Sequence, residues 1–238
     1  MIHPLKKFFP HSLHVVLPVI HAETLDQTLR NAAIANTAGS DGVFLIDHSI
    51  SSSELLQIAR GVLNEFPGWW VGVNCLGQPP EAVVAEIEPD ISGIWVDNAG
   101  INEFRDNQPE AEKFLQAREQ NGWGGLYFGG VAFKYQREVT ELERAGKVAA
   151  KYIDVVTTSG PGTGRPALRE KIVAMKRGLG EAPLAIASGI TPENVSDYLD
   201  LVTCFLVATG ISSSFTELDP ERLKALMARV KDLDHITS

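Results

Sequence analysis

Short apolar runs alternate with amphipathic stretches along the whole chain. The runs are continuously apolar and brief, a pattern typical of strands that are buried on both faces of a parallel sheet. Eight such runs are predicted to be strands, at residues 13–20, 43–46, 69–73, 93–96, 126–128, 153–157, 184–187 and 204–208.

The segments between these runs have the spacing of a helix with one apolar face. From Leu25 to Ala33, apolar residues recur at i, i+4, i+7 and i+8, and the pattern stops before Gly39, where a helix would end. We predict helices at residues 24–37, 53–65, 80–86, 109–120, 137–151, 167–179, 192–199 and 220–230. Four of these segments begin with a proline, which is favoured in the first helical turn.

About eight strand–helix units in 238 residues predict a (β/α)8 TIM barrel of the α/β class, for which about 250 residues is typical. A doubly wound open sheet is the alternative, but its first strand would lead into a glycine-rich GxGxxG turn. Here His21-Ala22-Glu23-Thr24 follows the first predicted strand. No linker divides the chain, so we predict one domain over 1–238, with an N-terminal extension at 1–12 and the barrel at about 13–231.

The charge balance excludes some partners. The chain has 21 Lys and Arg against 30 Asp and Glu, a net charge of −9, and its basic residues are scattered, which argues against nucleic acid and anionic membranes. No run approaches the ~20 apolar residues of a membrane span. The basic and apolar stretch at 6–20 imitates a signal peptide, but polar residues interrupt it and no small-residue cleavage site follows. We expect a cytoplasmic protein.

The two cysteines, Cys75 and Cys204, lie inside apolar runs. They form neither a disulfide framework nor a CxxC pair. We expect two buried, reduced thiols that behave as small hydrophobic side chains.

Polar residues follow the predicted strands, where a TIM barrel has its functional rim. Asp47 and Asp97 would face each other across the mouth as general acid and base, or each could cap a turn. His48 could move a proton. Lys134 could neutralise a phosphate or form a Schiff base, or be a solvated lysine. The other candidates on this rim, as substrate-binding residues, are His21, Asn74, Asn98, Ser159, Gly160 and Thr163.

Glycine turns after the seventh and eighth strands give the most specific signal. They contain Ser188-Gly189 and Thr209-Gly210, and exposed backbone N–H groups at this place in a barrel can bind a phosphate. The alternative is that both glycines only make tight turns. The glycine-rich loop at 157–166 is a candidate lid or second anion clamp.

Two other motifs are weaker. Asp154 precedes a hydroxyl-rich loop that loosely matches the phosphoribosyl-diphosphate loop of type I phosphoribosyltransferases, but a second carboxylate is missing. The histidines have neither HxH nor HExxH spacing, so we predict no metal site. The sequence identifies no cofactor, and magnesium is the ion to test alongside phosphorylated ligands.

The chain resembles the BtpA-like family of barrels. The resemblance rests on GVFLI at 42–46, VGVNCL at 71–76, the segment 154–164 and SGITPENV at 188–195, and it covers about residues 13–231. It implies a ribulose-phosphate-binding TIM barrel, with phosphate recognised at Ser188, Gly189, Thr209 and Gly210. Labels within that family range from photosystem I biogenesis factor to sugar-related enzyme or phosphoribosyltransferase.

Two functional hypotheses follow. The first is an enzyme, such as a lyase, isomerase or phosphoribosyltransferase, that acts on a phosphorylated sugar or nucleotide-like metabolite. The second is a non-enzymatic assembly or regulatory factor. We also expect a homo-oligomer, because Trp69-Trp70 and Phe8-Phe9 could supply apolar surface to an interface, although tryptophans near a strand start also pack between barrel and helices.

Overall fold

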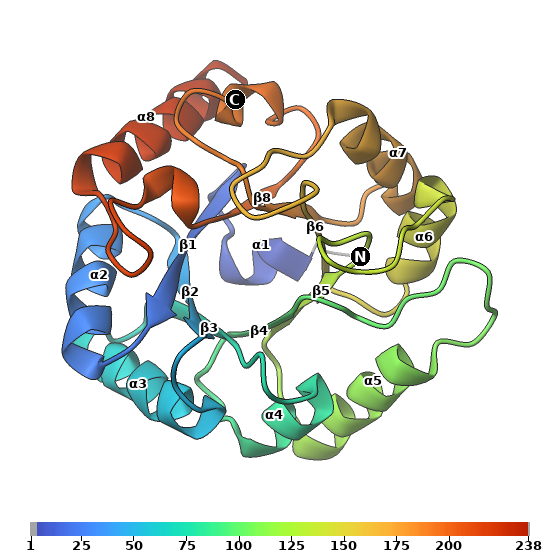
Figure 1. Cartoon of the computed structure of the whole chain (residues 1–238), viewed down its shortest axis with the longest axis horizontal. Coiled ribbons are helices and arrows are strands. Elements are labelled where there is room, and N and C mark those ends of the chain that lie inside the picture. Colours follow the sequence, from blue (N-terminus) through green and yellow to red (C-terminus); the bar gives the residue numbers. More distant parts are fainter. Residues whose placement is uncertain (1–3, 238) are drawn as a thin grey trace.

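Eight parallel strands form a closed barrel in chain order (Figure 1). The computed structural model describes residues 4–237, with side chains for residues 4–232. The prediction of a (β/α)8 barrel is confirmed. The strands are β1 (Val15–Ala22), β2 (Gly42–Asp47), β3 (Trp70–Asn74), β4 (Gly93–Val96), β5 (Leu126–Gly130), β6 (Val155–Thr158), β7 (Leu184–Ala187) and β8 (Cys204–Val207).

Helices surround the barrel as an outer ring (Figure 1). Proline starts three of them, as the sequence predicted, and Thr24 caps another by accepting a hydrogen bond from the Gln27 N–H at 3.2 Å. The ring consists of α2 (Leu25–Thr37), α3 (Ser52–Glu65), α4 (Pro80–Glu86), α5 (Pro109–Asn121), α6 (Leu142–Ala149), α7 (Arg169–Leu179) and α8 (Pro220–Thr237).

The helix predicted at 192–199 is wrong. A 3-10 turn, η1 (Val195–Asp197), replaces it, and a second, η2 (Thr209–Ile211), follows β8. The side chain of Asn194 accepts from the Thr191 N–H at 2.8 Å and donates to the Gly189 carbonyl at 2.7 Å. Such side-chain bonds to nearby backbone compete with helix formation, so the segment stays in turns.

Large aromatic side chains fill the barrel interior. The ring of Phe44 packs against those of Trp70 and Phe128, with centroids 5.1 and 5.0 Å apart. Neighbouring strands supply glycine where these rings need room: a Cβ on Gly72 would lie 2.4 Å from the Phe44 ring, and one on Gly93 2.3 Å from the Trp70 ring. The interior is therefore a packed core rather than a channel.

The N-terminal helix α1 (Pro4–Phe8) lies across the far end of the barrel in Figure 1. Leu5 and the adjoining Phe9 are buried in the same cluster as the barrel interior, and the Phe9 ring is 5.7 Å from that of Trp70. Trp69 is half-buried and packs on Phe66. The aromatic pairs that suggested an oligomer interface thus mostly cover the barrel's own core.

A second apolar layer lies between the barrel and the helices. Cys75 and Cys204 are free thiols and are buried, as predicted. Burial raises the pKa of Cys75 to about 12 and holds that of Cys204 well above its ordinary value, so both thiols stay protonated. Within residues 4–237, the helices include none that is both long and apolar enough for a membrane span.

Candidate functional site

A cavity of about 240 Å³ lies at the mouth of the barrel, on the side where the strands end. Inward-facing apolar residues of the strands form its floor, among them Val19, Ile46, Trp95 and Leu206. The predicted site residues that line it are His21, His48, Asp97, Lys134, Thr163, Ser188 and Thr209. Seven residues far apart in sequence thus meet at one place, because each follows a strand of the barrel.

Two histidines and a phenylalanine form one wall of this mouth cavity. The rings of His21 and His48 are 4.8 Å apart, and Phe215 from the β8–α8 loop lies 4.1 Å from the first and 5.3 Å from the second. Burial, His48 and Lys134 lower the pKa of His21 to about 4. The imidazole of His21 is therefore neutral near pH 7 and can both donate and accept one hydrogen bond.

Asp97 is the carboxylate that faces the mouth cavity. Its Oδ1 accepts a hydrogen bond from Asn74 Nδ2 at 3.1 Å. Burial raises its pKa, although the Asn74 bond and the nearby positive charge of Lys134 oppose the shift. A carboxyl group whose pKa is moved toward neutrality can act as a general acid or base.

The ends of β7 and β8 present unused backbone donors. Within the described chain, no turn, loop or cap hydrogen bond uses the amide N–H of Ser188, Gly189, Thr209 or Gly210. Ser188 and Thr209 line the cavity, whereas Gly189 and Gly210 are buried next to them and do not line it. Neighbouring N–H groups at this corner of a barrel are suited to an anion.

The glycines of this corner also permit close packing. A Cβ on Gly210 would lie 1.8 Å from the Ile190 carbonyl oxygen, and one on Gly189 2.2 Å from the Pro166 nitrogen. Gly189 has a φ of +68°, and the non-glycine Ser188 beside it has a φ of +147°. Such a backbone conformation is strained in a non-glycine residue and persists only where the surrounding structure holds it in place. The two interpretations, tight turns and an anion-binding site, therefore apply to the same backbone segments and do not exclude each other.

The β5–α6 and β6–α7 loops are joined over the cavity. The Oγ of buried Ser159 accepts from the Lys134 N–H at 2.7 Å, and the Ser159 carbonyl accepts from Lys171 Nζ at 2.6 Å. Tyr135, at a φ of +60°, uses its hydroxyl to accept from the Thr163 N–H at 3.3 Å. Gly160 donates its N–H to Ser188 Oγ. Ser159 and Gly160 thus lie behind the cavity and hold the residues that line it.

Asp47 is not among the residues that line the mouth cavity. It is 6% exposed, and its two oxygens accept from Ser52 Oγ at 2.7 Å and from the Leu76 N–H at 2.6 Å. Asp47 therefore joins the start of α3 to the β3–α4 loop. Asp154 lies at the opposite end of the barrel, before β6, where it accepts from the Tyr127 N–H and from Arg118.

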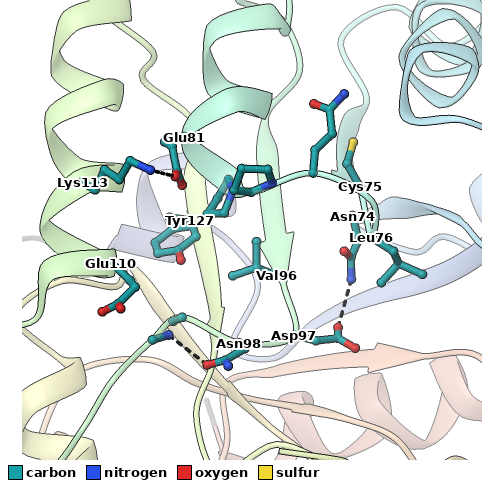
Figure 2. Close-up of a pocket in the computed structure, with 15 residues that line it drawn as sticks. Asn74, Cys75, Leu76, Glu81, Val96, Asp97, Asn98, Glu110, Lys113 and Tyr127 are labelled. Carbon is teal, nitrogen blue, oxygen red and sulfur yellow. Dashed lines mark hydrogen bonds and ion pairs between the residues drawn. The ribbon is translucent and has the colours of Figure 1, made fainter.

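Asn74 and Asn98 line a second, larger cavity beside the first (Figure 2). Asn74 is buried and points to Asp97, while Asn98 is exposed and its Oδ1 accepts from the Gly100 N–H at 2.9 Å. Asp97 lines both cavities.

Several site residues had no clear sequence signal. Lys171 belongs to α7 and reaches the rim only because its side chain extends back over β6; burial lowers its pKa to about 8. Phe215 directly follows Ser212-Ser213-Ser214, and its only signal was that of a single aromatic residue in the polar segment after the eighth strand. Phe215 is 62% exposed and Tyr135 79% exposed.

The described side chains contain no group of three or more His, Cys, Asp or Glu residues that could hold a metal ion.

Comparisons with known proteins agree on the fold. No family model matches the chain, and no curated protein matches it. Among solved structures, phosphoribosyl anthranilate isomerase from Thermus thermophilus is 18% identical with a TM-score of 0.65, covering 92% of this chain and 99% of that one.

Tryptophan synthase subunit alpha from Legionella pneumophila is 12% identical with a TM-score of 0.70, covering 98% and 100% of the two chains. A phosphoribosyl anthranilate isomerase in complex with a reduced carboxyphenylamino-deoxyribulose 5-phosphate is 15% identical with a TM-score of 0.63, covering 92% and 99%. The chain is thus a (β/α)8 barrel similar over nearly its whole length to barrels of this kind.

Proposed function

We propose that this protein is an enzyme that binds a phosphorylated small molecule, such as a sugar phosphate or a nucleotide-like metabolite, in the mouth cavity. The observation that carries the proposal is the set of unused N–H donors of Ser188, Gly189, Thr209 and Gly210 at the ends of β7 and β8. A phosphate dianion held there would satisfy donors that the fold leaves without partners.

The charges around the cavity agree with this assignment. Lys134 lies on the cavity wall and supplies a positive charge that is felt at His21, His48 and Asp97. The solved isomerase complex with a deoxyribulose 5-phosphate compound supports the same ligand class by analogy of fold. The resemblance to the BtpA-like family implies this class as well.

Asp97 is the group proposed to move a proton. Its Oδ1 is occupied by Asn74, and Oδ2 makes no hydrogen bond with the described residues, so one oxygen is left for a substrate. Lys134 would stabilise negative charge that develops near Asp97 during the reaction. His48, more exposed at the edge of the cavity, would exchange the proton with solvent.

The test is a thermal-shift and calorimetry screen of inorganic phosphate, ribose 5-phosphate, ribulose 5-phosphate, phosphoribosyl diphosphate and nucleoside monophosphates, each with and without magnesium. A ligand at ~100 times its Kd stabilises the folded state by about 2.7 kcal/mol. For a chain of this size that corresponds to a rise in Tm of about 5–10 °C.

Thr209 gives the sharper variant, because an added side chain at Gly210 would strike the Ile190 carbonyl. Thr209 is exposed, so Thr209→Asp adds a negative charge without a packing clash, and Thr209→Asn is its neutral control. We expect Thr209→Asp to weaken phosphate binding by about tenfold or more, and Thr209→Asn to change it little. Equal affinities in the two variants would refute the proposed phosphate site.

A further inference from the structure

The cavity of Figure 2, about 410 Å³, opens directly beside the mouth cavity. It lies between the β3–α4 loop and the beginning of α5. Asp97 and Leu76 line both cavities. A molecule bound at the mouth can therefore extend past Asp97 into this side cavity.

Tyr127 shows that the side cavity is built for a polar group. The residue comes from β5, is 1% exposed, and stacks on Phe114 with the ring centroids 3.9 Å apart. Its hydroxyl reaches the side cavity (Figure 2) and makes no hydrogen bond with the residues the structure describes. Burial and the nearby Glu81 raise the pKa of this hydroxyl, which keeps it neutral. The hydroxyl therefore opens into the side cavity and can both donate and accept a hydrogen bond from a ligand there.

Three of the remaining lining residues carry a carboxyl group, whereas Lys113 supplies a positive charge. Glu81 is 18% exposed and pairs with Lys113, whose Nζ lies 2.5 Å from its Oε1 and which is itself 68% exposed. Glu110, at the start of α5, makes no ion pair or hydrogen bond within the described chain. Asp97 adds a third carboxyl group. The side cavity therefore favours a group that donates hydrogen bonds and carries positive charge.

We propose that the side cavity is a second subsite of the same substrate site, and that it takes a cationic nitrogen group, an amine or amidine, of a phosphorylated molecule. The inference rests on the proposed function, because the phosphate of that molecule would lie at the ends of β7 and β8. Asp97 lies between the two subsites, so the bonds nearest to it would be those that link the phosphorylated part to the nitrogen group.

The experiment measures affinity by calorimetry for two matched series of probes. One series is ω-aminoalkyl monophosphates of increasing chain length, and the other is ω-hydroxyalkyl monophosphates of the same lengths. Inorganic phosphate is the reference ligand for the mouth cavity. At the length that spans both cavities, we expect the amine to bind about tenfold tighter than the alcohol, which is the effect of one charge-assisted hydrogen bond.

Three variants locate the effect. Glu110→Gln should reduce the amine-to-alcohol affinity ratio to about one, and Tyr127→Phe should reduce it by about threefold, the loss of one neutral hydrogen bond. Glu119→Gln removes the same charge from an exposed position further along α5 and should keep the wild-type ratio, which controls for the attraction of any amine to an acidic protein.

The outcomes separate the two proposals. If inorganic phosphate and all phosphorylated probes fail to bind, the proposed function falls and the subsite falls with it. If phosphate binds but the affinity ratio is about one at every chain length, the subsite is refuted while the proposed function stands. A ratio that survives both Glu110→Gln and Tyr127→Phe also refutes it.

Discussion

Replacing Asp154 should destabilise the barrel through two lost contacts. Its Oδ2 accepts from Arg118 Nη1 at 2.7 Å and from the Tyr127 N–H at 2.8 Å, which joins α5 and β5 to the start of β6. The Arg118 and Asp154 side chains are 22% and 23% exposed, so water replaces these bonds only in part. Arg118 keeps its bond to the Gly125 carbonyl.

The size of the effect follows from these contacts. In Asp154→Ala, the Tyr127 N–H loses its acceptor, which costs about 1–3 kcal/mol. The loss of the charged bond to Arg118 costs about 1 kcal/mol after allowance for its partial exposure. We expect a total of about 3 kcal/mol and a fall in Tm of about 6–12 °C. Asp154→Asn keeps an acceptor for Tyr127 and should cost about half as much.

The assay is urea unfolding followed by tryptophan fluorescence, with the m-value checked for two-state behaviour. Adding Arg118→Met to each Asp154 variant completes a double-mutant cycle that isolates the ion pair. The reasoning is wrong if Asp154→Ala costs less than about 1 kcal/mol, or if Asp154→Asn costs as much as the alanine variant.

Three further predictions concern the core and the mouth cavity. The pKa of His21 is lowered to about 4 in the folded protein, so the unfolded chain binds a proton at this histidine more readily than the folded chain does. The free energy of unfolding should therefore fall as the pH drops from about 6.5 toward 4, and His21→Gln should flatten this slope in urea titrations. Gly72→Ala should cost about 1–3 kcal/mol through the clash with the Phe44 ring, and Phe44→Leu in the same chain should recover part of the loss in Tm. Burial raises the pKa of Asp97, so the charged carboxylate lowers stability above that pKa. Asp97→Asn should therefore raise the free energy of unfolding at pH 7 and abolish any turnover found in the ligand screen; a less stable variant would contradict the sign.

The barrel could be predicted from the sequence because its strands are buried on both faces. Continuous apolar runs such as 93–96 and 184–187 coincide with β4 and β7. The helix predicted at 192–199 is absent for a local reason. The Asn194 side chain hydrogen-bonds to nearby backbone groups, and the spacing of apolar residues does not indicate such bonds. Helix α6 begins at Leu142 rather than at 137; before it, Arg137 bonds to Glu103 and to the Ile101 carbonyl in the loop after β4.

The candidate site was predictable where its residues lie at the end of a strand or in the loop that follows. His21, Asp97 and Lys134 lie in such places and meet in the mouth cavity. Tyr127 could not be found in this way, because it lies in the middle of an apolar run and its hydroxyl matters only through the cavity that α4 and α5 leave beside it. Lys171 is brought to the rim by the packing of α7, which sequence spacing does not encode.

The helix α1 closes the barrel from below, and this has a consequence for the order of folding. Its residues leave the ribosome before those of the barrel, yet the cluster that buries Leu5 and Phe9 includes Trp70 of β3 and Phe128 of β5. The place where α1 docks therefore does not exist until β5 has been made. Contacts so distant along the sequence form late because they close long loops, so α1 should dock in one of the last folding steps. The backbone amides of α1 should then be among the first to exchange hydrogen when the native state opens locally.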